Sequence, residues 1–180
     1  MSENARFSAR RIAADGILIA LFFLLSLLSF EVGGVKLTLD AFPVLIAAVL
    51  FGPIDGFLVG LLGAFLEQMA HFGFTATTAL WILPPAIRGL AIGLGLKKAQ
   101  LGSIRYFAVN LFAALLVSCG NTAVFYADSK LFGYYQYSLI FGVFFWRIIS
   151  SLLTGAVIAA IALPVFAALK KNGIGKDLRL

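Results

Sequence analysis

The stretch at residues 35–63, VKLTLDAFPVLIAAVLFGPIDGFLVGLLG, decides the fold. It holds two apolar runs, at 41–51 and from 54 onward, which only Gly52-Pro53 separates. Such a pair breaks a helix and favours a tight turn. The runs are continuous, whereas a strand of a membrane barrel alternates polar and apolar residues. The stretch therefore predicts a short membrane helix, a turn and a longer membrane helix.

The composition of the whole chain agrees with a membrane protein. Of its 180 residues 62% are hydrophobic and only 12% are charged, and the mean hydropathy is +1.03. A soluble domain is about 45–50% apolar and about 25% charged. These values exclude a disordered chain, a disulfide-stapled secreted domain and an ordinary cytosolic enzyme. The single cysteine, Cys119, permits no intrachain disulfide and is expected to be a packing residue.

We expect one all-α integral membrane domain with six spans. A span needs about 17–25 residues, so the run at 41–51 is too short to cross the bilayer alone as a straight helix. We expect it to form a short second span that a tight turn joins to the third. Pro84-Pro85 lies inside the fourth span, and Pro164 is expected to bend the sixth. The spans are predicted at residues 12–30, 41–51, 54–72, 79–96, 106–126 and 138–169.

The basic residues predict the orientation of the chain. Six spans place both termini on one side, and most of the 14 Lys and Arg fall on that side: Arg6, Arg10, Arg11, Lys97, Lys98, Arg105, Lys170, Lys171, Lys176 and Arg179. Lys36 and Lys130 fall in the opposite loops, and Arg88 and Arg147 fall within spans. Because cytoplasmic loops carry an excess of Lys and Arg, both termini are expected in the cytoplasm.

Small residues recur four apart on several spans, where they let helix backbones approach closely. We expect internal packing for three of these stripes: Gly56, Gly60 and Ala64; Gly89 and Gly93; and Ser151, Gly155 and Ala159.

Ionisable and aromatic residues within the spans indicate a binding site. Glu67 and His71 lie four apart on one helix face, next to Gln68. Arg88 lies ten residues into its span, about 15 Å deep, and Arg147 has a similar depth. In one interpretation Glu67 pairs with an arginine and the aromatic residues Trp81, Tyr126, Tyr134, Tyr135 and Tyr137 form an interfacial belt. In the other, an outward-facing aromatic cavity offers an arginine to an anionic ligand group.

Motifs of enzymes are missing from the sequence. It has no G-x-S-x-G elbow and no P-loop, and its lone histidine has no partner for a catalytic triad. One His and one Cys without a pair of acids make a metal site unexpected, and no cofactor is expected. Uphill transport would therefore need an ion gradient or a partner protein.

The 35–63 stretch, with its Pro-containing short helix, GP turn and G-x-x-x-G-rich helix, resembles the substrate-binding S components of energy-coupling factor (ECF) vitamin transporters. The six-span layout agrees along nearly the whole chain. The resemblance implies a multi-pass protein of a prokaryotic plasma membrane that binds a vitamin near the outer face. It also implies partners, a transmembrane coupling subunit and two cytosolic ATPases, which reorient the S component in the bilayer. Gly73-Phe74-Thr75 and the single arginine of the sixth span look most like the folate-type branch.

The resemblance also implies roles for particular residues. Ala13, Gly16 and Ala20 share a helix face and would dock on the coupling subunit. The link at 33–40 would form a lid, with Gly33, Gly34 and Lys36 in it and Gly33-Gly34 as a hinge. The expected substrate-binding set is Asp40, Glu67, His71, Trp81, Arg88, Asn121, Tyr126 and Arg147.

Three functions remain open at this point. The first is an S component for a folate-like vitamin, since arginines suit carboxylates and aromatic rings suit a flat ring, with pantothenate as the alternative substrate. The second is a self-sufficient homo-oligomeric transporter or channel, which would move substrate alone in liposomes. The third is a membrane enzyme, which would depend on Glu67 or His71.

Overall fold

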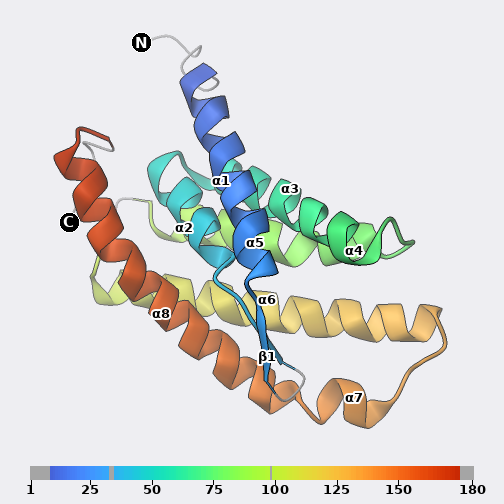
Figure 1. The fold of residues 1–180 in the computed structure, drawn as a ribbon. Helices are drawn as coiled ribbons and strands as arrows, with labels where there is room; N and C mark the ends of the chain where they lie inside the picture. The colour runs from blue at the N-terminus through green and yellow to red at the C-terminus, as the bar shows by residue number, and fades with distance from the viewer. Residues whose placement is uncertain (1–8, 33–34, 98, 175–180) are drawn as a thin grey trace.

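A computed structural model describes residues 9–32, 35–97 and 99–174. These residues form a helical bundle with one β-hairpin: α1 (Ala9–Leu27), β1 (Phe30–Val32), β2 (Val35–Leu37), α2 (Ala41–Leu50), α3 (Pro53–Phe72), α4 (Thr78–Trp81), α5 (Leu83–Gly95), α6 (Ile104–Leu131), α7 (Tyr137–Phe141) and α8 (Phe144–Lys171). The blue start of α1 and the red end of α8 lie toward the same end of the molecule (Figure 1). We call this the inner end and the opposite one the outer end.

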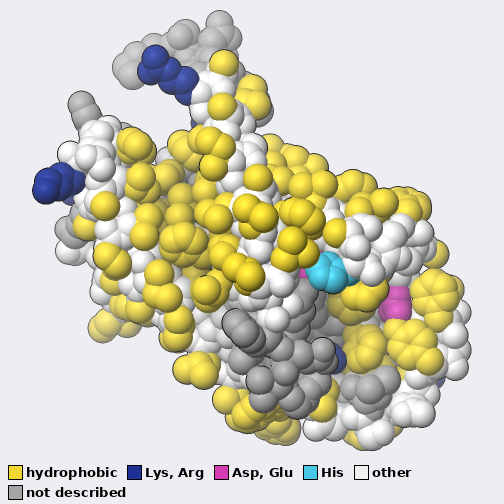
Figure 2. Space-filling model, viewed as in Figure 1, with side chains coloured by type: hydrophobic (Ala, Val, Ile, Leu, Met, Phe, Trp, Pro, Cys, Tyr) yellow, Lys and Arg dark blue, Asp and Glu magenta, His cyan; other side chains and the backbone are white. Residues whose placement is uncertain are grey.

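The bundle confirms an all-helical membrane protein. Within the described part of the chain, four helical segments are long and apolar enough to cross a membrane: Pro53–Phe72, Thr78–Gly95, Ile104–Leu131 and Phe144–Lys171. The helix α1 carries Arg10, Arg11 and Asp15 in its first two turns, and α2 has only 10 residues. The surface is mostly hydrophobic in the space-filling view, and the Lys and Arg side chains gather near the ends of the chain (Figure 2).

The short helix α2 forms the centre of the bundle. Its Val44, Leu45 and Ala47 are fully buried, and it packs against α3, α5, α1 and α8. An apolar helix of 10 residues is too short to cross a bilayer alone. The longer helices that surround α2 stabilise it by burying its apolar side chains. The turn after it begins α3 with Pro53, and Gly52 adopts a positive φ of 112° that suits glycine.

Three local features differ from the prediction. The link at 31–40 contains the hairpin β1–β2, which pairs Glu31 with Lys36 and lies against α8. The fourth span breaks at Ile82 into α4 and α5, because Pro84 and Pro85 are tolerated only in the first turn of a helix. The sixth span breaks after Gly142 into α7 and α8.

The boundaries of two helices also differ from expectation. Residues 128–137 are expected to be a loop, but α6 continues through Leu131, so Asp128 and Lys130 are helical. Pro164 lies inside α8, which continues to Lys171. A proline removes one backbone hydrogen bond without ending a long helix that neighbouring helices support.

Glycines allow α3 and α5 to approach closely, as the small-residue stripes predict. A Cβ on Gly89 would lie 2.0 Å from the carbonyl oxygen of Gly56, and one on Gly60 would lie 2.3 Å from that of Pro85. A Cβ on Gly93 would lie 2.4 Å from the Cα of Pro53. We call this contact the glycine seam. It joins residues 53–60 of α3 to residues 85–93 of α5 by van der Waals contact, the main attraction between helices in lipid.

An ion pair that the sequence did not suggest joins α1 to α3 at the inner end. The Nε of Arg11 donates to Oδ1 of Asp55 at 2.6 Å, and its Nη2 donates to Oδ2 of Asp55. The same Nη2 donates to the carbonyl oxygen of Phe51 at 2.6 Å. Asp55 is buried, so this pairing compensates a carboxylate removed from water.

Candidate binding cavity

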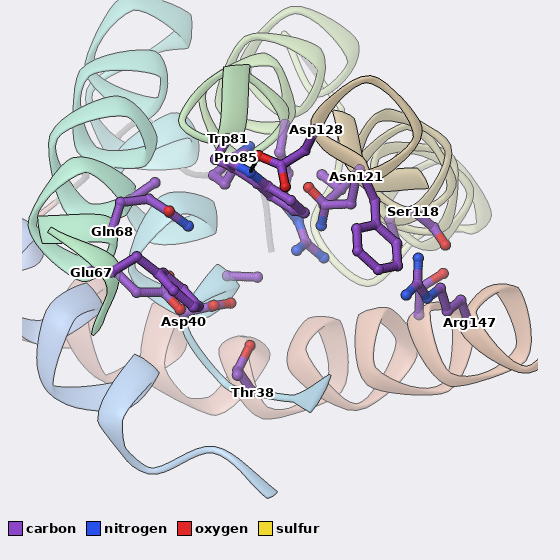
Figure 3. A pocket seen from close by; sticks show the side chains of 18 of the residues that line it. Thr38, Asp40, Glu67, Gln68, Trp81, Pro85, Ser118, Asn121, Asp128 and Arg147 are labelled. Carbon is purple, nitrogen blue, oxygen red and sulfur yellow. Dashed lines mark hydrogen bonds between the residues drawn. The ribbon is translucent and has the colours of Figure 1, made fainter. Parts of the chain in front are cut away.

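A cavity of about 640 Å³ lies between α3, α5, α6 and α8, toward the outer end of the bundle. The start of α2 and the residues before it complete its wall, with Thr38 and Asp40. In the close-up, Glu67 and Gln68 lie on one side, Arg147 and Ser118 lie opposite, and Trp81, Asn121 and Asp128 form a third wall (Figure 3). The cavity thus collects side chains from α1, α2, α3, α4, α5, α6 and α8.

Most of the residues predicted for the site line this cavity. They are Asp40, Glu67, Trp81, Arg88, Asn121 and Arg147. His71 lies outside it, because its ring is exposed in the last turn of α3 with Nδ1 3.1 Å from the carbonyl oxygen of Glu67. Tyr126 also lies outside and is 43% exposed, because its ring packs edge-on against Tyr135.

Arg88 and Arg147 face the cavity, and no carboxylate of the described residues forms a salt bridge with either of them. Arg88 lies deep in the bundle, keeps part of its surface open to the cavity and interacts electrostatically with Asp40. The Cζ atom of Arg147 lies 5.0 Å from the centroid of the Phe125 ring. Between the residues that the structure describes, the salt bridge formed is Arg11–Asp55. The pairing of Glu67 with an arginine, one of the two interpretations of the sequence, is not formed between those residues.

Three carboxylates also reach the cavity, from Asp40, Glu67 and Asp128. Asp128 accepts hydrogen bonds from the hydroxyls of Thr77 and Tyr134 and from the indole Nε1 of Trp81. The pKa of Tyr134 is raised to about 12, mainly by burial and secondly by the hydrogen bond to Asp128. Its hydroxyl therefore remains a neutral donor near pH 7. The cavity offers both cationic donors and anionic acceptors to a ligand.

Asp128 and Phe125 are cavity residues that the sequence prediction missed. Together with Ser118 and Asn121 they follow spacings of three, four and three residues, which place them on one face of α6. This signal was present in the sequence. For Asp128 the signal is obscured because the predicted span ends at residue 126, whereas Phe125 lies inside that span.

The predicted docking residues lie on an open face of α1. Ala13, Gly16 and Ala20 are exposed, and a Cβ on Gly16 would have no atom within 4 Å. This differs from the glycine seam, where the same residue type is closely covered. Of the predicted lid, Gly33 and Gly34 lie outside the described residues. Lys36 belongs to β2, but its side chain is also outside the description.

Comparison with known proteins identifies the family. Residues 6–171 match the family described as "ECF-type riboflavin transporter, S component". The chain belongs to this family. A solved structure titled "Structure and mechanism of the S component of a bacterial ECF transporter" superposes with a TM-score of 0.66 and 18% sequence identity, covering 89% of this chain and 98% of that chain. That likeness supports the fold.

Bacterial relatives that carry only a family number are also similar. A UPF0397 protein of Streptococcus thermophilus strain LMD-9 is 27% identical over 167 residues, covering 89% of this chain and 91% of its own. A UPF0397 protein of Leuconostoc citreum is 33% identical over 102 residues, which span about half of each protein, 55% of this chain and 53% of the relative. A UPF0397 protein of Streptococcus pneumoniae strain CGSP14 is 32% identical over 98 residues, covering 53% of this chain and 52% of its own.

Family membership confirms the resemblance to ECF S components. The chain is therefore a membrane-bound component of a transporter and not an enzyme. The family description names riboflavin, whereas the sequence suggested the folate-type branch, and the matches do not support that narrower assignment.

Proposed function

We propose that this chain captures a vitamin with a planar heterocyclic ring in the outer cavity, as the S component of an ECF-type importer. The single observation that carries the proposal is a cavity of about 640 Å³ whose wall combines aromatic rings with two arginines and three carboxylates. Sites for small organic ligands have volumes of about 300–1,000 Å³ and a few polar groups that orient the ligand. Here the polar groups lie within membrane helices, where their cost indicates a functional role.

The aromatic residues favour a ligand with a flat ring. Trp81, Phe125 and Tyr134 lie on one wall, with ring centroids 6.1–6.4 Å apart. Faces and edges of such rings stack on planar heterocycles at a small entropic cost. Pantothenate has no ring of this kind, so the cavity supports it less well.

Riboflavin is our first candidate substrate, and a folate-like vitamin is the second. The family description favours riboflavin. Among the described residues the lining has three carboxylates and two arginines, which suits a neutral ring with both donor and acceptor edges. A folate-like vitamin draws its support from Arg88 and Arg147, because guanidinium groups bind carboxylates in a bidentate manner.

Transport would be powered by other polypeptides. We propose that the open face of α1, with Ala13, Gly16 and Ala20, docks on a transmembrane coupling subunit that two cytosolic ATPases drive. A surface of short side chains allows close but separable helix contact. Both termini would lie in the cytoplasm, so the cavity would open to the outside. The hairpin β1–β2, which leads directly to Thr38 and Asp40 in the cavity wall, would serve as its lid.

Mass spectrometry of small molecules that copurify with the protein tests this proposal without assuming a ligand. We expect a planar-ring vitamin at close to one molecule per chain, and its loss from the Arg88→Met variant. Copurification of pantothenate alone would contradict the planar-ring assignment. Uphill accumulation of solute by liposomes that contain only this chain would instead establish the self-sufficient transporter.

A further inference from the structure

We propose that Asp128 is the positioning residue of the cavity's aromatic wall. It holds Trp81 and Tyr134 on the two sides of Phe125, and through the Phe125 ring it sets the place of the Arg147 guanidinium. This inference rests on the proposed function for its importance, because the wall matters to transport only if a ligand lies against it. The geometry itself can be tested without a ligand.

Asp128 uses both of its carboxylate oxygens to join separate segments. Oδ1 accepts from the hydroxyl of Thr77 and from the indole Nε1 of Trp81, the latter at 3.4 Å, and Oδ2 accepts from the hydroxyl of Tyr134. Thr77 is the residue before α4, Trp81 ends α4, and Tyr134 lies between α6 and α7. Hydrogen bonds to an ionised acceptor are about twice as strong as neutral ones.

The segments that carry Trp81 and Tyr134 are both short. The helix α4 has four residues and is separated from α5 by Ile82, and residues 132–136 form no helix. A small threonine cluster, in which the backbone N–H of Thr75 donates to Oγ1 of Thr78 at 2.9 Å, orders the approach to α4. Asp128 stands on α6, a helix of 28 residues, and so supplies the rigid anchor for both segments.

The rings that Asp128 holds are in contact with Phe125. The centroids of Trp81 and Phe125 are 6.4 Å apart with an interplanar angle of 50°, and those of Phe125 and Tyr134 are 6.1 Å apart at 43°. Arg147 lies over the Phe125 ring with its Cζ 5.0 Å from the centroid. All of these side chains line the cavity, and Trp81 and Arg147 are labelled there in Figure 3. A shift of Trp81 or Tyr134 would therefore move the ring that supports the cation.

The neighbouring Tyr135 offers a matched control. Its ring packs edge-on against Tyr126, with centroids 5.5 Å apart, and the Nζ of Lys130 lies 3.7 Å from its centroid. It does not belong to the cavity lining. The substitutions Tyr134→Phe and Tyr135→Phe each remove one hydroxyl from adjacent residues, but only the first removes a hydrogen bond to Asp128.

The first experiment measures the position of Trp81 in the absence of a ligand. The chain has two tryptophans, so Trp146→Phe leaves Trp81 as the only indole fluorophore. In that background we expect Asp128→Asn and Tyr134→Phe to shift the emission of Trp81 and increase its quenching by iodide, and Tyr135→Phe to leave both unchanged. Equal spectra for Tyr134→Phe and its parent would overturn the inference. Tyr134→Phe keeps the ring, so it remains informative if Asp128→Asn does not fold.

The second experiment titrates riboflavin against the same variants by quenching of its fluorescence. We expect Kd to rise about tenfold for Asp128→Asn and about threefold for Tyr134→Phe, with Tyr135→Phe within about twofold of its parent. Riboflavin binding that is equal in all variants would overturn the inference and leave the proposed function standing. If the parent protein binds no riboflavin, that ligand assignment fails, and the iodide quenching of Trp81 still decides whether Asp128 positions the wall.

Discussion

The arginines at the inner and outer ends of the bundle differ in their partners. At the inner end, Arg11 is bound by Asp55 and by the carbonyl of Phe51, and the glycine seam closes the contact between α3 and α5. At the outer end, Arg88 and Arg147 face a cavity and form no salt bridge within the described chain. A half-buried cation bound to a buried carboxylate is part of the scaffold, whereas a cation at a cavity is available to a ligand.

The glycine seam predicts the largest effect on stability. In Gly89→Ala the new Cβ would lie 2.0 Å from the carbonyl oxygen of Gly56, so the two helices must move apart. We expect a loss of about 3 kcal/mol or more in the free energy of unfolding, seen as a lower midpoint of thermal aggregation in detergent. The matched control is Gly16→Ala, where nothing lies within 4 Å. Equal midpoints for the two variants would show that α3 and α5 do not touch as described.

The ion pair at the inner end predicts a smaller loss of stability without a change in binding. Arg11→Gln leaves the Asp55 carboxylate buried and removes its charged partner. We expect a loss of about 1–3 kcal/mol in the free energy of unfolding, because an unpaired buried charge costs more than the bond itself contributed. Arg10→Gln, on the exposed preceding residue, serves as the control. A changed vitamin affinity in Arg11→Gln would contradict the assignment of this ion pair to the scaffold alone.

Removal of a cavity arginine is expected to weaken binding of the vitamin without a large loss of stability. Arg147→Ala takes away a cation that contacts the Phe125 ring and reaches the cavity, but it leaves no buried carboxylate unpaired among the described residues. We expect the Kd for the vitamin to rise about tenfold in calorimetry, while the thermal midpoint stays close to that of the wild type. An unchanged Kd would remove Arg147 from the site and leave Arg88 as the candidate cation.

The proposed docking face of α1 predicts that a substitution there abolishes uptake without changing binding. Gly16→Leu adds a bulky side chain on an open surface, so the chain should fold and bind its vitamin as before. Contact with a coupling subunit would be blocked, and uptake by cells would be lost. Preserved uptake would mean that the partner binds elsewhere.

The sequence predicted more of the scaffold than of the site. Apolar runs and glycine spacing were enough to place α2, α3 and the seam, because membrane helices must satisfy their own backbone and small residues mark close contacts. The hairpin β1–β2 was missed, since a polar link with two glycines carries little strand signal.

Depth and charge led to Arg88, Arg147 and Glu67, which line the cavity, but the direction of each side chain was not predictable. His71 shares a helix face with Glu67 by spacing, yet its ring is exposed at the end of α3 beside the carbonyl of Glu67. Asp128 was missed because its helix continues farther than its polar sequence suggests. Such features depend on contacts between distant segments, which periodicity along one segment does not contain.

The most direct test of the account is calorimetric titration of the purified chain alone with riboflavin, folate and pantothenate. The account predicts saturable binding of a planar-ring vitamin, riboflavin first, at one molecule per chain, and a marked loss of that binding in Arg88→Met. Binding of pantothenate in preference to both planar-ring vitamins, or undiminished affinity in Arg88→Met, would contradict it.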